Sequence, residues 1–191
     1  MSLRRRLLMQ DYSLPQAYTE LNFISFDGNG YCLTDYLIKS DDRVEYRSRA
    51  SKLVDNGLFG VNSTAGESFY IFYDGRNVVA AHGETSATSS NCIVYTPRDY
   101  IYQNSMLYEA GNNKITAFST AAFKSKQPMY IGAINNGGTP DYPFNGTVYY
   151  FRIYNNSGKL LRSYVPCTRN SDGKAGLFEL VYQKFCPILP L

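Results

Sequence analysis

Carboxylates, nucleophiles and histidine are the side chains of this sequence that could perform catalysis. Hydrolysis of a glycosidic bond, for example, requires two carboxyl groups about 5 to 9.5 Å apart. Residues two apart on a strand share a face, yet Glu45, Glu67 and Glu179 have no acidic residue two positions away. A Ser or Cys nucleophile requires a general base, and the single histidine, His82, stands beside Gly83 in no recognisable motif. The sequence therefore predicts that the protein is not an enzyme.

Metal ligation and disulfide formation are the next chemistry to consider. The four cysteines Cys32, Cys92, Cys167 and Cys186 include no C-x-x-C pair. This spacing, with a single histidine, offers no zinc site of four clustered ligands. Widely spaced cysteines on strands are usually buried as small apolar side chains. We expect that role here, while a Cys167–Cys186 bridge stays open.

Polar residues in two turns are the candidates for ligand binding. Binding residues often lie on loops, and a sugar is held by aromatic faces together with a few fixed polar groups. One group follows FYIFY (69–73), and the other lies in the loop after MYIGAI (129–134). We predict that the ligand-binding residues are Asp74, Arg76, Asn77, Asn135, Asn136, Asp141 and Tyr142. Most of these residue types also form turns, so a purely structural role is the alternative for each.

Two-residue alternation dominates the sequence and predicts the strands that hold these turns. In 43–50 the odd positions are charged, which is typical of a strand with one wet face. In 147–154 the alternation predicts that Tyr149, Phe151 and Ile153 pack in the core. Further strands are expected at 69–73, 78–81, 91–95, 100–109, 129–134, 159–165 and 177–185. The segment 119–127 is expected to be a loop or one helical turn. Roughly ten to twelve short strands separated by turn signals predict an all-β, antiparallel two-sheet β-sandwich.

Composition and charge fit a folded β-rich domain. Hydrophobic residues make up 44% of the chain and aromatic residues 15%, with no Trp; Tyr and Phe favour strands. The net charge of +3 comes without a basic stripe interleaved with aromatics, so we expect no nucleic-acid partner. The Arg-rich start is followed by too few apolar residues for a signal peptide, and no run approaches the roughly 20 residues of a membrane span. We divide the chain into an N-terminal arm (1–13) and one domain (14–191).

Several segments from residue 14 onward match the motifs of a known family. The opening has Leu14-Pro15, then Tyr18-Thr19 and an apolar strand. Farther on, MYIGA (129–133) and FNGTVYYFRIY (144–154) match a strand, a loop and a Tyr-rich strand. These segments resemble the LamG-like, concanavalin A-like jelly-roll family. The resemblance implies a jelly-roll sandwich, while fold alone does not fix function.

The same resemblance implies what the domain binds. Glucanases of this fold share a Glu-x-Asp-x-x-Glu strand, which is absent here, so the resemblance implies a non-enzymatic carbohydrate-binding or adhesion domain. Relatives often hold Ca²⁺ through oxygen ligands, and Asp141 and Asn135 are the candidates in this sequence. No other cofactor is expected.

The resemblance also implies where the protein works. An Arg-rich start followed by Leu-Pro and Tyr-Thr resembles virion proteins of bacteriophages and prophages of gut bacteria. This implies display on the head or tail surface of a particle and recognition of host or mucosal glycans. Arg4, Arg5 and Arg6 are then predicted to dock on another virion protein, or else form a solvated tail. The alternatives are a structural virion decoration or fibre protein and a lectin module of the bacterial cell surface; a homo-oligomer stays open.

Overall fold

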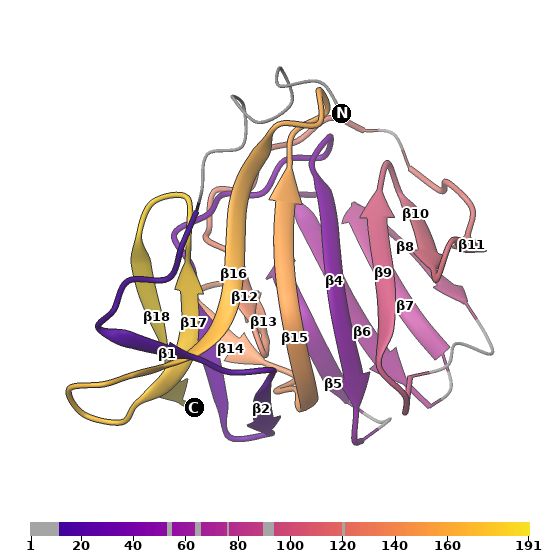
Figure 1. Cartoon of the computed structure of the whole chain (residues 1–191). Helices are drawn as coiled ribbons and strands as arrows, with labels where there is room; N and C mark the ends of the chain where they lie inside the picture. Colours follow the sequence, from indigo (N-terminus) through magenta and orange to yellow (C-terminus); the bar gives the residue numbers. More distant parts are fainter. Residues whose placement is uncertain (1–11, 53–54, 64–65, 76, 90–93, 120) are drawn as a thin grey trace.

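The computed structural model describes residues 12–52, 55–63, 66–75, 77–89, 94–119 and 121–191. These residues form 18 strands and no helix, arranged as two sheets packed face to face (Figure 1). Pairing between these strands is antiparallel, except that β13 (Ile134–Asn136) runs parallel to β5 (Asn56–Asn62). The predicted all-β, antiparallel sandwich is therefore confirmed. The part of the chain that the model describes also has no helix of the length and apolarity that crossing a membrane requires.

The front sheet of Figure 1 is built around β15 (Asn145–Tyr154). One edge of β15 pairs with β4 (Arg43–Ala50), and the other pairs with β16 (Leu160–Arg169) and β2 (Ile24–Asp27). Beyond β4 lie β9 (Arg98–Gln103), β10 (Met106–Glu109) and β11 (Asn112–Ile115). Beyond β16 lies β17 (Ala175–Glu179), while β1 (Tyr18–Glu20) pairs with the end of β16.

The back sheet is built around β5. One edge of β5 leads to β6 (Ser68–Asp74), β7 (Asn77–Gly83) and β8 (Thr85–Ser89). The other edge pairs with β13, which forms a hairpin with β14 (Thr139–Asp141), and with β12 (Tyr130–Ile131), which leads to β3 (Gly30–Leu33). The last strand, β18 (Lys184–Pro190), pairs first with β17 and then with β3, so it joins the two sheets.

Aromatic side chains fill the space between the sheets. Tyr46 of β4 stacks on Tyr100 of β9 with ring centroids 5.0 Å apart, and it meets Phe59 of β5 edge-on at 5.3 Å. Phe59 also meets Phe151 of β15 at 4.8 Å. All four side chains are buried. Each such pair contributes about 0.5–1.5 kcal/mol beyond the area that it buries, so these contacts hold the two sheets against each other and fix which residues face outward.

Two segments predicted as single strands are hairpins, and the prediction was wrong there. The segment 100–109 divides between β9 and β10 at a turn where Asn104 and Ser105 have φ of 51° and 59°. The segment 177–185 divides between β17 and β18 at a turn that includes Gln183, with φ 58°. Asn104 and Ser105 are residue types that form turns, yet neither turn contains glycine or proline at these positions, so the strongest turn signal was missing. These unmarked turns and several strands of two to four residues raise the strand number above the expected one.

A bulge in β15 corrects the predicted orientation of Tyr149. The register with β4 shifts between Val148 and Tyr150, so Val148 turns into the core and is 1% exposed. Tyr149 is half-buried on the outside, where its ring lies 5.8 Å from that of Phe23. Phe151 is fully buried, as predicted. One extra residue in a strand therefore reverses the side-chain alternation before it.

The remaining predictions concern loops and cysteines. The described part of 119–127 is a loop with an isolated bridge at Lys124, and it contains no helical turn. Cys32, Cys167 and Cys186 are buried and free, so there is no Cys167–Cys186 bridge. Cys92 and most of the strand expected at 91–95 lie outside the described residues.

Candidate functional site

The outward face of the back sheet carries half-buried aromatic residues. In β6, alternate residues point into the core: Phe69, Ile71 and Tyr73 are at most 1% exposed. Side chains alternate across a strand, so Tyr70 and Phe72 point outward and are half-buried. The face therefore offers two aromatic rings next to each other on one strand.

The β13–β14 hairpin forms a wall beside these rings. The Tyr142 ring meets the Phe72 ring edge-on with centroids 5.0 Å apart. Asp141 Oδ1 accepts a hydrogen bond from the Tyr142 N–H at 2.9 Å, and Asp141 Oδ2 accepts one from Asn136 Nδ2 at 3.2 Å. Asn62 Nδ2 of β5 donates to Asn136 Oδ1 at 3.5 Å. These bonds hold the polar side chains in place before any ligand arrives, which lowers the entropic cost of binding.

Three adjoining hollows run along this face and on to the rim where β2 and β15 of the front sheet meet it, and we call them together the groove. The central hollow, of about 210 Å³, is lined by Asn62, Tyr70, Phe72, Val79, Ile134, Asn136, Asp141 and Tyr142. The serine hollow, of about 310 Å³, shares Asn62 and Tyr70 with it and adds Ser63, Ser68, Glu84, Thr85 and Ser86. The aspartate hollow, of about 440 Å³, shares Asp141 and Tyr142 with the central hollow and adds Asp27, Lys52, Asp55 and Asn145.

Two titratable groups of the groove have shifted pKa values, the Tyr70 phenol and the Asp27 carboxyl. Burial raises the pKa of the Tyr70 phenol, and the Tyr142 phenol close to it adds to the shift. Tyr70 is therefore protonated at neutral pH and is able to donate a hydrogen bond. A hydrogen bond from the Asn29 N–H lowers the pKa of the Asp27 carboxyl, which is ionised at neutral pH. The groove thus has a protonated phenol in its central hollow and an ionised carboxylate at one end.

Sequence reasoning placed three of its predicted residues at this site. Asn136, Asp141 and Tyr142 all line the central hollow. Asn135 is instead 0% exposed and supports the loop. Its Nδ2 donates a hydrogen bond to Pro128 O at 2.7 Å, and its Oδ1 accepts one from the Gly138 N–H at 2.7 Å. Asn135 is thus buried and hydrogen-bonded within the loop, and it does not line the central hollow beside Asp141, its companion in the calcium site that the family resemblance allowed.

The other predicted residues lie elsewhere. Asp74 and Asn77 pair with each other at the end of the β6–β7 hairpin and line none of the three hollows. Arg76, Arg4, Arg5 and Arg6 fall outside the described residues.

Sequence reasoning missed four residues that line the central hollow: Asn62, Tyr70, Phe72 and Val79. The FYIFY alternation was the available signal for Tyr70 and Phe72, because only one face of a sandwich strand packs in the core.

The candidate catalytic carboxylates have structural partners. Glu179 is buried and accepts the backbone N–H groups of Ser163, Val181 and Tyr182 at 2.9, 3.0 and 2.7 Å. Glu45 forms an ion pair with Arg43, and Glu67 forms one with Lys126. Each carboxylate therefore has a role in local structure.

His82 and the metal-ligating residue types offer no reactive centre in the described part of the chain. The His82 ring is 1% exposed, burial lowers the pKa of its imidazole, and Phe123 packs edge-on against it at 5.1 Å. Within the described residues, no three His, Cys, Asp or Glu side chains gather closely enough to hold a metal ion.

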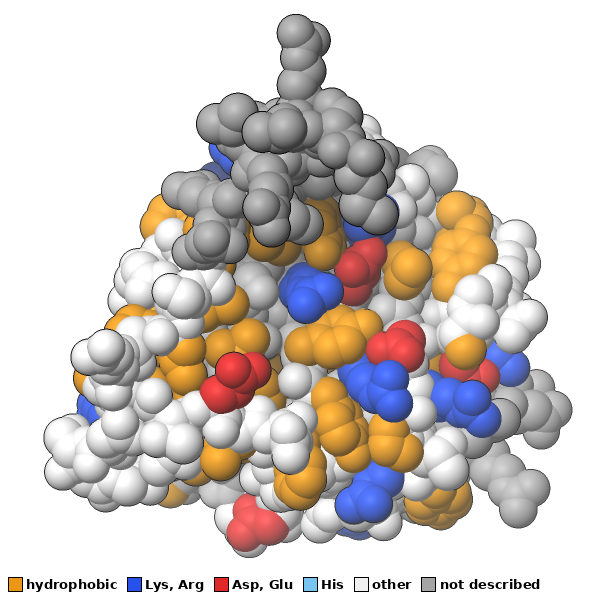
Figure 2. Space-filling model, in the orientation of Figure 1, with side chains coloured by type: hydrophobic (Ala, Val, Ile, Leu, Met, Phe, Trp, Pro, Cys, Tyr) orange, Lys and Arg blue, Asp and Glu red, His pale blue; other side chains and the backbone are white. Residues whose placement is uncertain are grey.

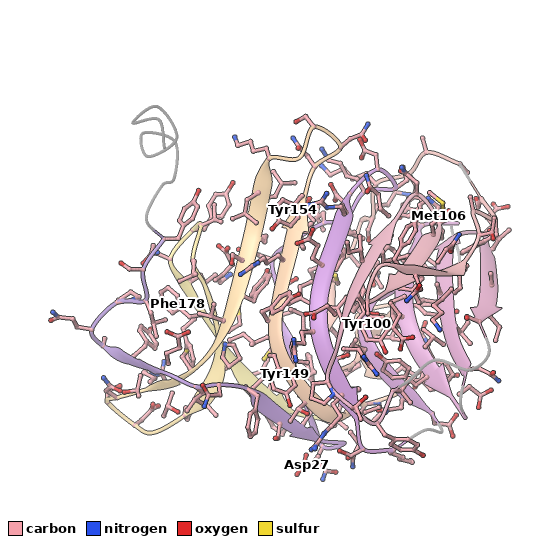
Figure 3. The ribbon with its side chains drawn as sticks, turned by 45° about the vertical axis from the view of Figure 1, so that its right-hand side comes forward. Asp27, Tyr100, Met106, Tyr149, Tyr154 and Phe178 are labelled. Carbon is pink, nitrogen blue, oxygen red and sulfur yellow. The ribbon has the colours of Figure 1, made fainter. Side chains whose placement is uncertain are left out.

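A second surface lies on the outside of the front sheet, where Figure 2 shows hydrophobic and charged side chains side by side. Arg43 covers the Tyr154 ring at 4.6 Å, and Arg47 lies 5.6 Å from the Tyr149 ring. Figure 3 shows these two tyrosines toward opposite ends of β15. Asp99 accepts a hydrogen bond from Arg47 Nη1 at 3.1 Å and another from the Tyr150 hydroxyl at 2.8 Å. Arg152 in turn covers the Tyr150 ring at 4.8 Å. This face therefore carries a row of cation–π contacts and ion pairs between side chains.

Comparison with known proteins identifies the fold. No protein-family model and no curated protein sequence matches the chain. Among solved structures, the mouse laminin alpha1 chain, domains LG4-5, has a TM-score of 0.55 at 18% identity, over 75% of this chain and 43% of that one. The Ruminococcus gnavus IT-sialidase CBM40 has a TM-score of 0.55 at 15% identity, over 75% and 93%. A proposed carbohydrate-binding protein from Bacteroides ovatus has a TM-score of 0.57 at 12% identity, over 91% and 61%.

These similarities define the class of fold. The chain has the jelly-roll sandwich that laminin LG domains and CBM40 modules share, as the resemblance in its sequence implied. It spans less than half the length of the laminin chain that it matches. One CBM40 structure is of the module bound to alpha2,3 sialyllactose. Identities of this size establish architecture, and the activity of this chain must be argued from its own residues.

Proposed function

We propose that this protein is a non-enzymatic carbohydrate-binding module that holds a glycan in the groove on its back sheet. The observation that supports this most is the central hollow, where Tyr142 and Phe72 form an aromatic corner beside Asn62, Asn136 and Asp141. The apolar face of a sugar ring packs on aromatic side chains, while its hydroxyls pair with amides and carboxylates. The carbohydrate-binding neighbours of the same fold give this assignment further support.

A binding experiment with two matched variants tests the proposal. A glycan array finds a ligand, and calorimetric titration then compares the wild type with Tyr142→Ala. The Tyr142 ring is 40% exposed, so its removal is expected to cost mainly ligand contacts, about 1.4 kcal/mol, or roughly a tenfold rise in Kd. Tyr95→Ala is the control, because Tyr95 is 56% exposed and lines none of the three hollows. Equal affinity of both variants and the wild type would reject the groove as the binding site.

We also propose that the module works on the surface of a bacteriophage particle, where it binds host or mucosal glycans. The motifs that support this setting are the Arg-rich start and the Leu14-Pro15 and Tyr18-Thr19 pairs that follow it. Removal of residues 1–13 is expected to abolish incorporation of the protein into particles, as measured by mass spectrometry of purified virions. Unchanged incorporation would reject a docking role for Arg4, Arg5 and Arg6. Recovery of the protein from the bacterial envelope instead would favour the cell-surface lectin alternative.

A structural virion protein is the second candidate function, and the front sheet favours it. Tyr and Arg are enriched where proteins bind one another, and the outer face of β4 and β15 presents both. If neighbouring chains pack on this face, Arg43→Glu together with Arg152→Glu lowers incorporation into particles and leaves glycan affinity unchanged. Normal incorporation of this double variant would reject the structural role of the front sheet.

A further inference from the structure

The charged side chains that line the groove are negative, with one exception. Glu84 lies in the serine hollow, and Asp141 lies between the central and aspartate hollows. Asp27 and Asp55 lie in the aspartate hollow. Among the described residues that line the three hollows, Lys52 is the single basic side chain. Four carboxylates therefore face one ammonium group along the groove.

Three arginines lie on the other side of the sandwich. Arg43, Arg47 and Arg152 lie on the outer face of the front sheet, where tyrosine rings and carboxylates bind them. None of these three arginines lines any of the three hollows. Their partners are Glu45, Asp99 and tyrosine rings of the front sheet, so they do not neutralise the carboxylates of the groove directly.

The hydrogen-bonding groups of the groove suit hydroxyls rather than anions. Anionic ligands are usually held by Arg or Lys, often with two parallel hydrogen bonds from one guanidinium. The central hollow offers instead the amides of Asn62 and Asn136, the Tyr70 hydroxyl and the Asp141 carboxylate. A sugar hydroxyl both donates and accepts, so it pairs with an amide and also donates to a carboxylate. A sulfate or carboxylate on the ligand has only acceptors and would be repelled by Asp141.

We infer, resting on the proposed function above, that the groove selects uncharged oligosaccharides and discriminates against sialylated, uronic and sulfated ones. The three hollows share walls at Asn62 with Tyr70 and at Asp141 with Tyr142, so the ligand lies along the face and spans more than one hollow. Tyr142 and Phe72 pack against a ring in the central hollow. The carboxylates at both ends then act on any anionic substituent of the neighbouring units.

The experiment compares neutral glycans with their anionic derivatives on one array, at about 20 and 150 mM NaCl. A unit charge about 8 Å from one carboxylate costs a factor of roughly two in affinity in water. The four carboxylates less Lys52 leave three net negative charges, which give at most on the order of a tenfold preference for the neutral partner at low salt. That preference shrinks at the higher salt concentration because the screening length falls. The double variant Glu84→Gln, Asp55→Asn is expected to reduce the preference several-fold. Glu20→Gln, on β1 of the front sheet, is the control and leaves it unchanged.

The outcomes separate this inference from the proposed function. A neutral preference that falls with salt and with the double variant supports the inference. Equal or tighter binding of anionic glycans overturns the charge argument, and glycan binding itself still stands. Absence of binding to every glycan on the array overturns the proposed function and the inference with it.

Discussion

The close approach of β5 and β6 depends on Gly60, and its replacement by alanine is the sharpest test of how the groove is built. Gly60 lies opposite Tyr70 with φ +140°, a conformation that L-residues rarely adopt. A Cβ at this position would lie 2.3 Å from both Phe69 O and Tyr70 Cβ. These are backbone and first-carbon atoms, so no side-chain rotation relieves the contact.

The expected cost of Gly60→Ala follows from these two terms. Strain at a glycine-only conformation costs about 1–3 kcal/mol, and overpacking costs about 1–3 kcal/mol more. A chain of this size loses about 2–4 °C in Tm for each kcal/mol, so we expect a fall of roughly 5–20 °C. Tyr70 also shifts away from Asn62, which weakens glycan binding.

Thermal unfolding followed by circular dichroism measures this effect, with Gly111→Ala as the matched control. Gly111 also has positive φ, +81°, yet nothing lies within 4 Å of the Cβ that alanine would add. The control therefore carries conformational strain alone, about 1–2 kcal/mol, and is expected to melt within roughly 8 °C of the wild type. Equal melting temperatures of the two variants would refute the argument that steric contact between β5 and β6 requires glycine.

Two further predictions concern parts of the fold remote from the groove. Glu179→Gln removes charge from a buried acceptor of three backbone N–H groups, so it is expected to lower the free energy of unfolding by about 2–3 kcal/mol in urea titration, and an unchanged midpoint would contradict that role. Burial raises the pKa of Cys167 to about 11 and of Cys186 to about 12, and it also raises the pKa of Cys32, so in a Cys92→Ser background all three remaining thiols should resist alkylation at pH 8 until the protein unfolds. Because the unfolded chain loses these protons first, from about pH 9, stability is expected to fall as pH rises through 9 to 11, and a flat profile over that range would contradict the burial of these thiols.

The fold was predictable from local signals because alternation is a local property. The charged odd positions of 43–50 predicted β4 with its bounds unchanged, Arg43–Ala50. The FYIFY run predicted β6, extended by one residue at each end. The positions of some turns were not predicted: Asn104 and Ser105 turn the chain with positive φ and without glycine. A β-turn at non-glycine residues is imposed by the pairing of β9 with β10, which a single stretch of sequence does not reveal.

The site was less predictable, since it is assembled from distant parts of the chain. The hairpin residues Asn136, Asp141 and Tyr142 were found because turn residues are recognisable in sequence. Their partners Asn62 and Tyr70 come from β5 and β6, and only the pairing of β13 with β5 brings them together. Asn135 and Asn136 are adjacent and chemically identical, yet one is buried and the other exposed. Strand alternation determines which of the two side chains is buried, and the residue type alone does not predict this.

The two outward faces of the sandwich differ in how their aromatic rings are used. On the front sheet, guanidinium groups cover the rings of Tyr149, Tyr150 and Tyr154 at 4.6 to 5.6 Å. A sugar that stacked there would first have to displace an arginine and lose the attraction between cation and ring. On the back sheet, Tyr142 meets Phe72 edge-on in the lining of the central hollow, and no Arg or Lys is among the described residues that line this hollow. The front rings therefore suit contact with another protein, which can pair with the arginines, whereas the back rings suit a sugar.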